Sequence, residues 1–449
     1  MRVLLSFVLL VLLPTALTAG DIAVTVYNSN LGVVSETRSL EFARGINRLA
    51  FADVPSQIDP ASVRFELVGT GHNVTILEQN YAYDLISPDQ MYVKYIDKQI
   101  ELVDKEGQLY SGTLLTQAGG AIVLRESSGR IKIIQMSQIT EVNFPSLPEG
   151  LITRPTLFWV YNSDHEGRLD GRVGYQTAGM NWAAEYVGVL NQDETKLDLS
   201  GWASINNSSG KTYVDAKLRL VAGDIHRARP EAARRAGRGM ALAEDKLYAG
   251  FEEKAFFEYH LYTLPRKATL ANREIKQIAL FEPARAAVEK VFIYRPERNP
   301  SKVEVAVKFT NDAASGLGLP LPAGRTRLFK ADEDGSLILL GEDNIDHTPK
   351  NEEVKVTVGY AFDIAAEERV MEQRKVSQRV IDKDIEIELR NRKDDPVTVE
   401  VEKKLYGFWD IQQSNLEFEK KDATTVIFKV PIKPDETVTV RFTVRNYLQ

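Results

Sequence analysis

The densest group of residues that could do chemistry is the stretch "GEDNIDHTP", which contains Glu342, Asp343, Asp346 and His347. Carboxylate and imidazole ligands so close together could hold a divalent cation, and two carboxylates at a suitable separation could serve glycoside hydrolysis. The same composition is typical of a loop between strands, where Asp and Asn side chains satisfy the backbone of turns. We interpret the stretch as a structural loop without metal or catalysis, and keep Asp343, Asp346 and His347 as candidates for binding.

A second candidate for binding is the arginine-rich segment between Asp224 and Tyr248. Gly, Ala and Pro dilute any apolar periodicity there, which predicts a mobile, solvated loop between strands. Its guanidinium groups could also contact anionic lipid or glycan phosphate through charge-assisted hydrogen bonds. The arginines concerned are Arg227, Arg229, Arg234, Arg235 and Arg238.

Several catalytic classes are excluded by inspection. The chain has no cysteine, so it has neither a thiol nucleophile nor a thiolate zinc site, and its five histidines form no HExxH motif. No GxSxG nucleophile elbow is present. The "GKT" of Gly210 to Thr212 lacks the glycine that a P-loop requires five residues earlier, where Ile205 stands. We therefore expect no catalytic residue and no cofactor.

The amino terminus indicates export. "MRVLLSFVLLVLLPTALTAG" places one Arg before a short apolar run and ends in small residues, which is typical of a signal peptide over residues 1–19. A retained anchor helix is the alternative. We expect a periplasmic or secreted protein with no transmembrane segment after cleavage. The formal net charge of −7 makes nucleic acid an improbable partner.

The elements that position these residues are predicted to be strands. Alternation of apolar and polar residues recurs in "DAKLRLVAG", "EEVKVTVGY", "DIEIELRNRK" and "ETVTVRFTVRN", separated by turn sequences such as "NSSG" and "KDDP". The fold class predicted is mainly β, with several antiparallel β-sandwich modules.

The segment "YQTAGMNWAAEYV" tests that interpretation, because Trp182 and Tyr186 fit one face of a helix as well as one face of a strand. Dense flanking glycines would weaken a helix by about 1 kcal/mol each. We predict a turn over residues 177–179 and a strand from Trp182 to Val189. Trp182 and Trp202 are then expected to be core anchors; a ligand-stacking platform is the alternative.

From about Leu151 to the C-terminus, the chain resembles the uncharacterised family whose conserved domain occurs in mucoidy-inhibitor-A-like proteins. The resemblance rests on "GYQTAGMNWAAEYVGVL", "LSGWASINNSSGKTYVDAKLRLVAGD" and the region from "LPAGRTRLF" through "GEDNIDHTP" to "VGYAFDI". It implies an exported, mostly β protein and no established activity. Such proteins often carry an upstream coiled coil, whereas the residues before Leu151 here are predicted to be β.

These patterns predict four modules after the leader. Residues 20–88 form an N-terminal β module, and residues 89–147 a small barrel similar to SH3-like or Sm-like folds, or else an extension of the first sheet. Residues 148–365 form a central β-sandwich with the mobile loop at 224–248. Residues 366–449 form an immunoglobulin-like sandwich. The segment 363–384 has the composition of a helix but a poor apolar stripe, so we predict a strand.

Two function classes follow. The first is a non-enzymatic envelope protein that binds another envelope protein or a surface glycan. The second is an envelope hydrolase that uses carboxylates on a β scaffold. Because the sequence shows no convincing nucleophile, base and orienting group, it favours the first class.

Overall fold

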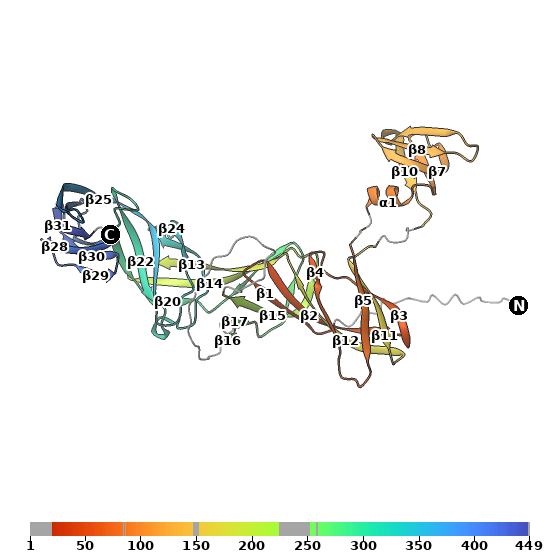
Figure 1. The fold of residues 1–449 in the computed structure, drawn as a ribbon, viewed down its shortest axis with the longest axis horizontal. Helices are drawn as coiled ribbons and strands as arrows, with labels where there is room; N and C mark the ends of the chain where they lie inside the picture. The colour runs from red at the N-terminus through yellow and green to blue at the C-terminus, as the bar shows by residue number, and fades with distance from the viewer. Residues whose placement is uncertain are drawn as a thin grey trace. The chain divides into compact units, whose positions relative to one another are not determined.

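The computed structural model describes residues 20–83, 85, 87–146, 152–223, 252–256 and 259–447. The predicted signal peptide at 1–19 and all five arginines of the arginine-rich segment lie outside these residues. Regular structure in the described part is almost entirely β, with one α-helix, α1 (Pro88–Lys94) (Figure 1). The predicted fold class, mainly β with several sheets, is confirmed.

The chain divides into two compact units. The first comprises residues 1–181, 206–218 and 266–274, and the second comprises residues 182–205, 219–265 and 275–449.

An eight-stranded sheet has the order β16-β17-β15-β1-β2-β12-β4, with β18 beside β15. Its strands are β1 (Ile22–Tyr27), β2 (Leu31–Phe42), β4 (Ile58–Leu67), β12 (Gly167–Thr177), β15 (Tyr213–Ala222), β16 (Glu252–Phe256), β17 (Tyr259–Thr263) and β18 (Ala268–Leu270).

Two smaller sheets belong to the first unit. A three-stranded sheet pairs β11 (Thr156–Ser163) with β3 (Gly45–Ala52) and β5 (Val74–Ala82). A five-stranded sheet has the order β10-β6-β7-β8-β9. Its strands are β6 (Gln99–Asp104), β7 (Leu109–Ala118), β8 (Ala121–Arg125), β9 (Ile131–Gln135) and β10 (Ile139–Asn143). In the described residues none of these five strands pairs with another sheet, so they do not extend the first one.

The hydrogen-bond pairing of the strands does not follow the module boundaries that the sequence predicted at residues 88 and 147. Strands β11 and β12 follow the five-stranded sheet in the chain, yet they pair with β3, β5, β2 and β4. The five-stranded sheet is therefore inserted between β5 and β11, and the first unit continues past residue 148. Alternation shows that a strand exists but not which distant strand supplies its hydrogen bonds, and this is why the boundary was wrong.

The second unit contains a six-stranded sheet in the order β19-β14-β13-β23-β24, with β20 beside β14. Its strands are β13 (Met180–Leu190), β14 (Lys196–Asn207), β19 (Glu274–Ala279), β20 (Ala284–Ala287), β23 (Gly324–Ala331) and β24 (Leu337–Ile345). Strands β13 and β23 are parallel, as are β21 and β27 of the sheet described next. These two sheets are therefore mixed, and long chain segments connect the parallel partners, as such pairs require.

Strand β13 confirms the interpretation of the Trp182 segment. Trp182 and Tyr186 are both buried on one face, and their polar atoms donate to the carbonyls of Val221 and Pro322, at 2.9 and 2.7 Å. Trp202 contradicts the prediction of a core anchor, because Trp202 is 39% exposed. On β14 the buried residues Leu199, Gly201 and Ala203 alternate along the strand and form its inward row. Trp202 lies between two of them and therefore points to the opposite face. The prediction of a core anchor holds for Trp182 alone.

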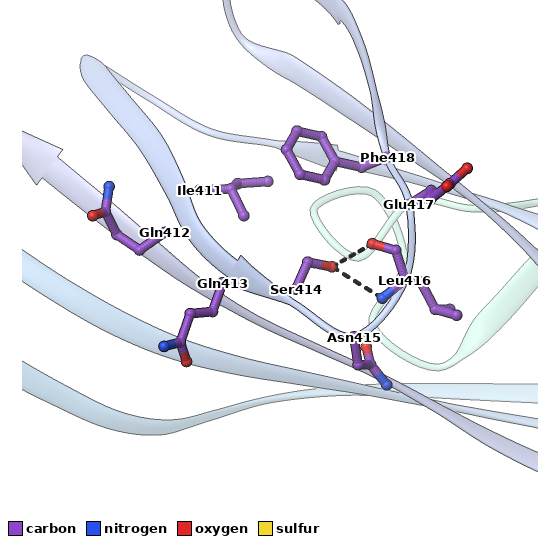
Figure 2. Close-up of a pocket in the computed structure, with 8 residues that line it drawn as sticks. All are labelled: Ile411, Gln412, Gln413, Ser414, Asn415, Leu416, Glu417 and Phe418. Atoms are coloured by element: carbon purple, nitrogen blue, oxygen red, sulfur yellow. Dashed lines mark hydrogen bonds between the residues drawn. The ribbon is translucent and has the colours of Figure 1, made fainter.

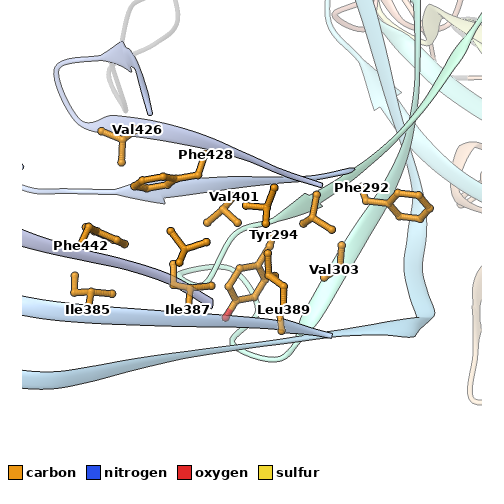
Figure 3. Close-up of a cluster of buried hydrophobic side chains, with 14 of the residues drawn as sticks. Phe292, Tyr294, Val303, Ile385, Ile387, Leu389, Val401, Val426, Phe428 and Phe442 are labelled. Carbon is orange, nitrogen blue, oxygen red and sulfur yellow. The ribbon is translucent and has the colours of Figure 1, made fainter. Parts of the chain in front are cut away.

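A nine-stranded sheet completes the second unit, in the order β28-β31-β26-β25-β22-β21-β27-β30-β29. Its strands are β21 (Glu289–Tyr294), β22 (Lys302–Thr310), β25 (Glu353–Ser377), β26 (Val380–Asn391), β27 (Val397–Lys404), β28 (Phe408–Ser414), β29 (Glu419–Asp422), β30 (Thr425–Ile432) and β31 (Thr437–Tyr447). Inward side chains from its two halves, among them Ile387, Val401 and Phe428, pack against one another (Figure 3).

The long strand β25 settles two predictions. The segment 363–384 is strand, as predicted, and not helix. The predicted boundary at residue 366 is wrong, because β25 runs through it and pairs with β22 before it and β26 after it. The C-terminal sandwich therefore also includes β21 and β22, which lie before residue 311 in the chain.

Candidate binding site

The best-formed site lies at one end of the core of the nine-stranded sheet, where inward positions change from apolar to charged. On β25 the inward row of Ile364 and Ala366 continues with Glu368. On β27 the row that includes Val401 continues with Lys403. Since alternate residues of a strand share a face, these two charged side chains occupy core-facing positions from opposite sides of the sandwich.

Lys403 joins two carboxylates at this position. Its Nζ lies 2.8 Å from a carboxylate oxygen of Glu368 and 2.8 Å from one of Glu297, in the loop after β21. The residue is only 8% exposed. An ammonium group so buried requires such partners, because removing an unpaired charge from water costs several kcal/mol. Lys403 thus has two carboxylate partners for the three N–H groups of its ammonium.

Glu368 keeps one oxygen unused. Its Oε1 accepts from Lys403, whereas its Oε2 is buried and has no hydrogen-bond donor among the described residues. A buried acceptor left without a donor costs about 1–3 kcal/mol. Such an atom beside a cavity marks a place where a bound molecule can supply the missing donor.

A groove of about 600 Å³ opens beside this cluster, and we call it the core-end groove. Its floor is apolar, and its rim carries two aromatic rings, Tyr406 and Phe408, which are 68% and 64% exposed. A volume of this size and a mixture of apolar floor and few polar groups are typical of ligand sites. The lining residues are Glu297, Glu368, Val370, Ile381, Lys383, Ile385, Lys403, Lys404, Leu405, Tyr406, Gly407, Phe408, Val444, Asn446 and Tyr447.

A second recess, formed by residues 411–418, has fewer features of a binding site. Figure 2 shows that it is a turn whose polar groups bind one another: the Ser414 hydroxyl donates to the Leu416 carbonyl at 2.6 Å and accepts from the Leu416 amide at 3.2 Å. The recess is wide open and its serine is already satisfied. We therefore do not treat it as a site.

A second buried charge cluster lies in the first unit, around Glu36 of β2. Glu36 accepts hydrogen bonds from Lys211 Nζ at 3.0 and 3.1 Å, from Arg38 and from the Tyr175 hydroxyl. Burial opposes ionisation of Glu36, but Lys211 and Arg38 outweigh it and lower the pKa of this carboxyl. Burial also lowers the pKa of Lys211, although Glu36 opposes that shift. Lys211, the lysine of the "GKT" sequence, thus forms a buried ion pair with Glu36.

The acidic stretch predicted to be a loop is partly strand. Glu342 and Asp343 belong to β24, and only Asp346 and His347 follow it. Asp343 accepts from the Thr357 amide at 2.7 Å, and His347 Nδ1 accepts from the Ala323 amide at 3.1 Å. The described residues contain no group of three potential metal ligands. The loop assignment failed for β24 because the edge strand has polar residues on both faces, which hides its alternation.

None of the binding candidates named from the sequence lines the core-end groove. The five arginines lie outside the described residues, and the structure brings Asp343, Asp346 and His347 to the end of β24 instead. Sequence reasoning missed Glu368 and Lys403. The signal was present in "VTVEVEKKL", where the apolar row of Val397, Val399 and Val401 puts Lys403 on the inward face.

Comparison with known proteins adds one family. Residues 24–116 match the model of an N-terminal domain of unknown function (DUF4140). No curated protein matches the chain significantly. The matched region covers strands of the first unit and precedes the region from Leu151 on which the resemblance to mucoidy-inhibitor-A-like proteins rested, so that resemblance is not established by the match. In the described residues, no helix has the length and apolar character needed to span a bilayer.

Proposed function

We propose that this chain is an exported, non-enzymatic envelope protein that binds another envelope protein or a surface glycan through the core-end groove. The observation that carries the proposal is the combination found at one place: exposed aromatic rings, an apolar floor and a buried carboxylate oxygen without a donor. The signal-peptide pattern at residues 1–19 supports a periplasmic or secreted location. The net charge of −7 argues against nucleic acid.

The alternative, a carboxylate-dependent hydrolase, is less well supported by the same groove. Glycoside hydrolysis requires one of two carboxyl groups to act as a proton donor. Here Glu297 and Glu368 both contact the Lys403 ammonium at 2.8 Å. This arrangement suits two carboxylates that hold a lysine in place.

Site-specific photo-crosslinking in the native envelope tests the proposal. A benzophenone amino acid placed at Phe408, on the groove rim, should give a reproducible crosslinked species that mass spectrometry identifies as a protein or a glycan. The same probe placed at Phe362, an exposed aromatic of β25 that does not line the groove, is the matched control. Equal crosslinking at the two positions, or none at Phe408, would contradict binding at the groove.

A further inference from the structure

We propose that the ligand of the core-end groove is an acidic saccharide, that is, a short glycan whose sugar rings carry carboxylate groups. This inference rests on the proposed function and selects one of its two partner classes. It follows from four features of the groove: net positive charge, aromatic residues at the rim, polar groups and limited size.

The charge of the lining favours an anion. Lys403 pairs with Glu297 and Glu368, both at 2.8 Å, and these three side chains carry one net negative charge. Lys383 and Lys404 line the same groove, and within the described ranges neither has an ion-pair partner. The three lysines and two glutamates of the lining together leave one net positive charge for an anionic ligand, and an ammonium–carboxylate hydrogen bond is among the stronger polar contacts.

Aromatic residues border the groove at the strand ends. Phe408 and Tyr447 occupy paired positions on β28 and β31, in the row opposite the core-facing Trp409 and Val444. Both are exposed, as is Tyr406. The C–H groups on one side of a pyranose pack against aromatic faces, and its hydroxyls at the edge stay free for polar groups.

The polar groups of the groove match those hydroxyls. Glu368 lines the groove, and its buried Oε2 lacks a donor among the described residues. The Asn446 amide, which also lines the groove, has both a donor and an acceptor. A ligand with many hydroxyls and a carboxylate satisfies this set better than an aliphatic acid does.

The size of the groove favours a glycan over a protein partner. Stable protein interfaces bury about 1,200–2,000 Å² of surface in total. A groove of about 600 Å³ is in the range of sites for ligands of a few rings. A protein partner would have to use additional surface, and it becomes an outcome of the test below.

Isothermal titration calorimetry of the full chain tests this inference with oligogalacturonate and oligoglucuronate of three to four sugars. The comparison ligand is fully methyl-esterified oligogalacturonate, which keeps the rings and hydroxyls but loses the charge. We expect at least one acidic oligosaccharide to bind, and its ester to bind about a hundredfold more weakly, since the charge-assisted contacts to both Lys383 and Lys404 are lost. Binding should also weaken as salt concentration rises.

Matched variants locate the site. Lys383→Gln and Lys404→Gln should each weaken binding about tenfold, whereas Lys350→Gln, an exposed lysine of the same unit outside the groove, should leave it unchanged. Circular dichroism checks that every variant stays folded. Equal affinity for acid and ester, or unchanged binding by both groove variants, would overturn the inference.

The failure of this inference is distinguishable from failure of the proposed function. If the folded chain binds neither acidic oligosaccharide but Phe408 crosslinks specifically to a protein, the saccharide assignment is wrong and groove binding stands. If neither saccharide binding nor a specific crosslink at Phe408 is found, both proposals are wrong.

Discussion

The Glu36 cluster of the first unit and the Lys403 cluster of the second both form around an inward charged residue, but they differ in whether every buried acceptor has a donor. In each, a charged residue takes an inward position in a strand row that also contains buried apolar residues. Around Glu36, three side chains donate to one carboxylate, and both Glu36 and Lys211 are buried. Around Lys403, one carboxylate oxygen of Glu368 is left without a donor and a groove lies alongside.

The difference shows when a buried charge indicates a binding site. Buried, shifted titratable groups occur both in functional sites and in structural ion-pair networks. The Glu36 cluster has the stronger burial, and the pKa values of both Glu36 and Lys211 are lowered, but both oxygens of Glu36 already have donors within the protein. We therefore assign a structural role to the Glu36 cluster and a binding role to the open Lys403 cluster.

Glu36→Gln should cause the largest loss of stability. The substitution preserves size but leaves Lys211 and Arg38 without a counter-charge inside the first unit. Breaking a buried pair by removing one partner costs about 3–5 kcal/mol of unfolding free energy. Urea unfolding followed by circular dichroism measures the loss, and hydrogen exchange locates it in the first unit.

Glu41→Gln is the matched control for that variant. Glu41 lies on the same strand and pairs with Arg168, but both side chains are exposed. An exposed ion pair contributes about 0–1 kcal/mol. If the two variants lost similar stability, the Glu36 cluster would not be the structural element that we infer.

Lys403→Met should cost less than Lys211→Met. Both substitutions leave carboxylates without their lysine, but Glu297 and Glu368 border the core-end groove and are less deeply buried than Glu36. We expect about 1–3 kcal/mol for Lys403→Met and a loss nearer 3–5 kcal/mol for Lys211→Met. Thermal unfolding of the two variants side by side checks the order. The reverse order would mean that the groove is closed to water.

The pH dependence of stability tests whether Glu36 is ionised in the folded protein. The pKa of Glu36 is lowered from its ordinary 4.5, so the unfolded chain takes up a proton there at a higher pH than the folded chain does. Stability from this group is present above pH 4.5 and is lost as pH falls through the lowered folded pKa. The stability difference between the wild-type protein and Glu36→Gln should therefore shrink in acid. Unfolding free energies measured across pH 3–7 test it, and a constant difference would contradict the ionised pair.

Alternation predicted most strands correctly, including β13, whereas strand was predicted for the part of β25 with a helical composition because its apolar stripe was poor for a helix and the family resemblance favoured a long strand. It could not predict which strands pair. The insertion of the five-stranded sheet and the extent of β25 depend on hydrogen bonds between residues far apart in the chain. For the same reason, the inward position of Lys403 is readable from its strand, whereas its partner Glu297, in a loop, is not. Trp202 shows that residue type alone does not set which face is buried.

Phe408→Ala should have the smallest effect on stability and a large effect on binding. Its ring is mostly exposed at the groove rim, and surface substitutions usually change unfolding free energy by less than about 0.5 kcal/mol. If the rim binds a sugar face, this variant loses affinity in calorimetry while its melting temperature stays near the wild-type value. Phe362→Ala, which removes an exposed ring of the same unit away from the groove, should alter neither quantity. A clear drop in the melting temperature of Phe408→Ala would instead show that the ring packs against the end of the sandwich, and the Lys403 cluster would then resemble the closed cluster around Glu36.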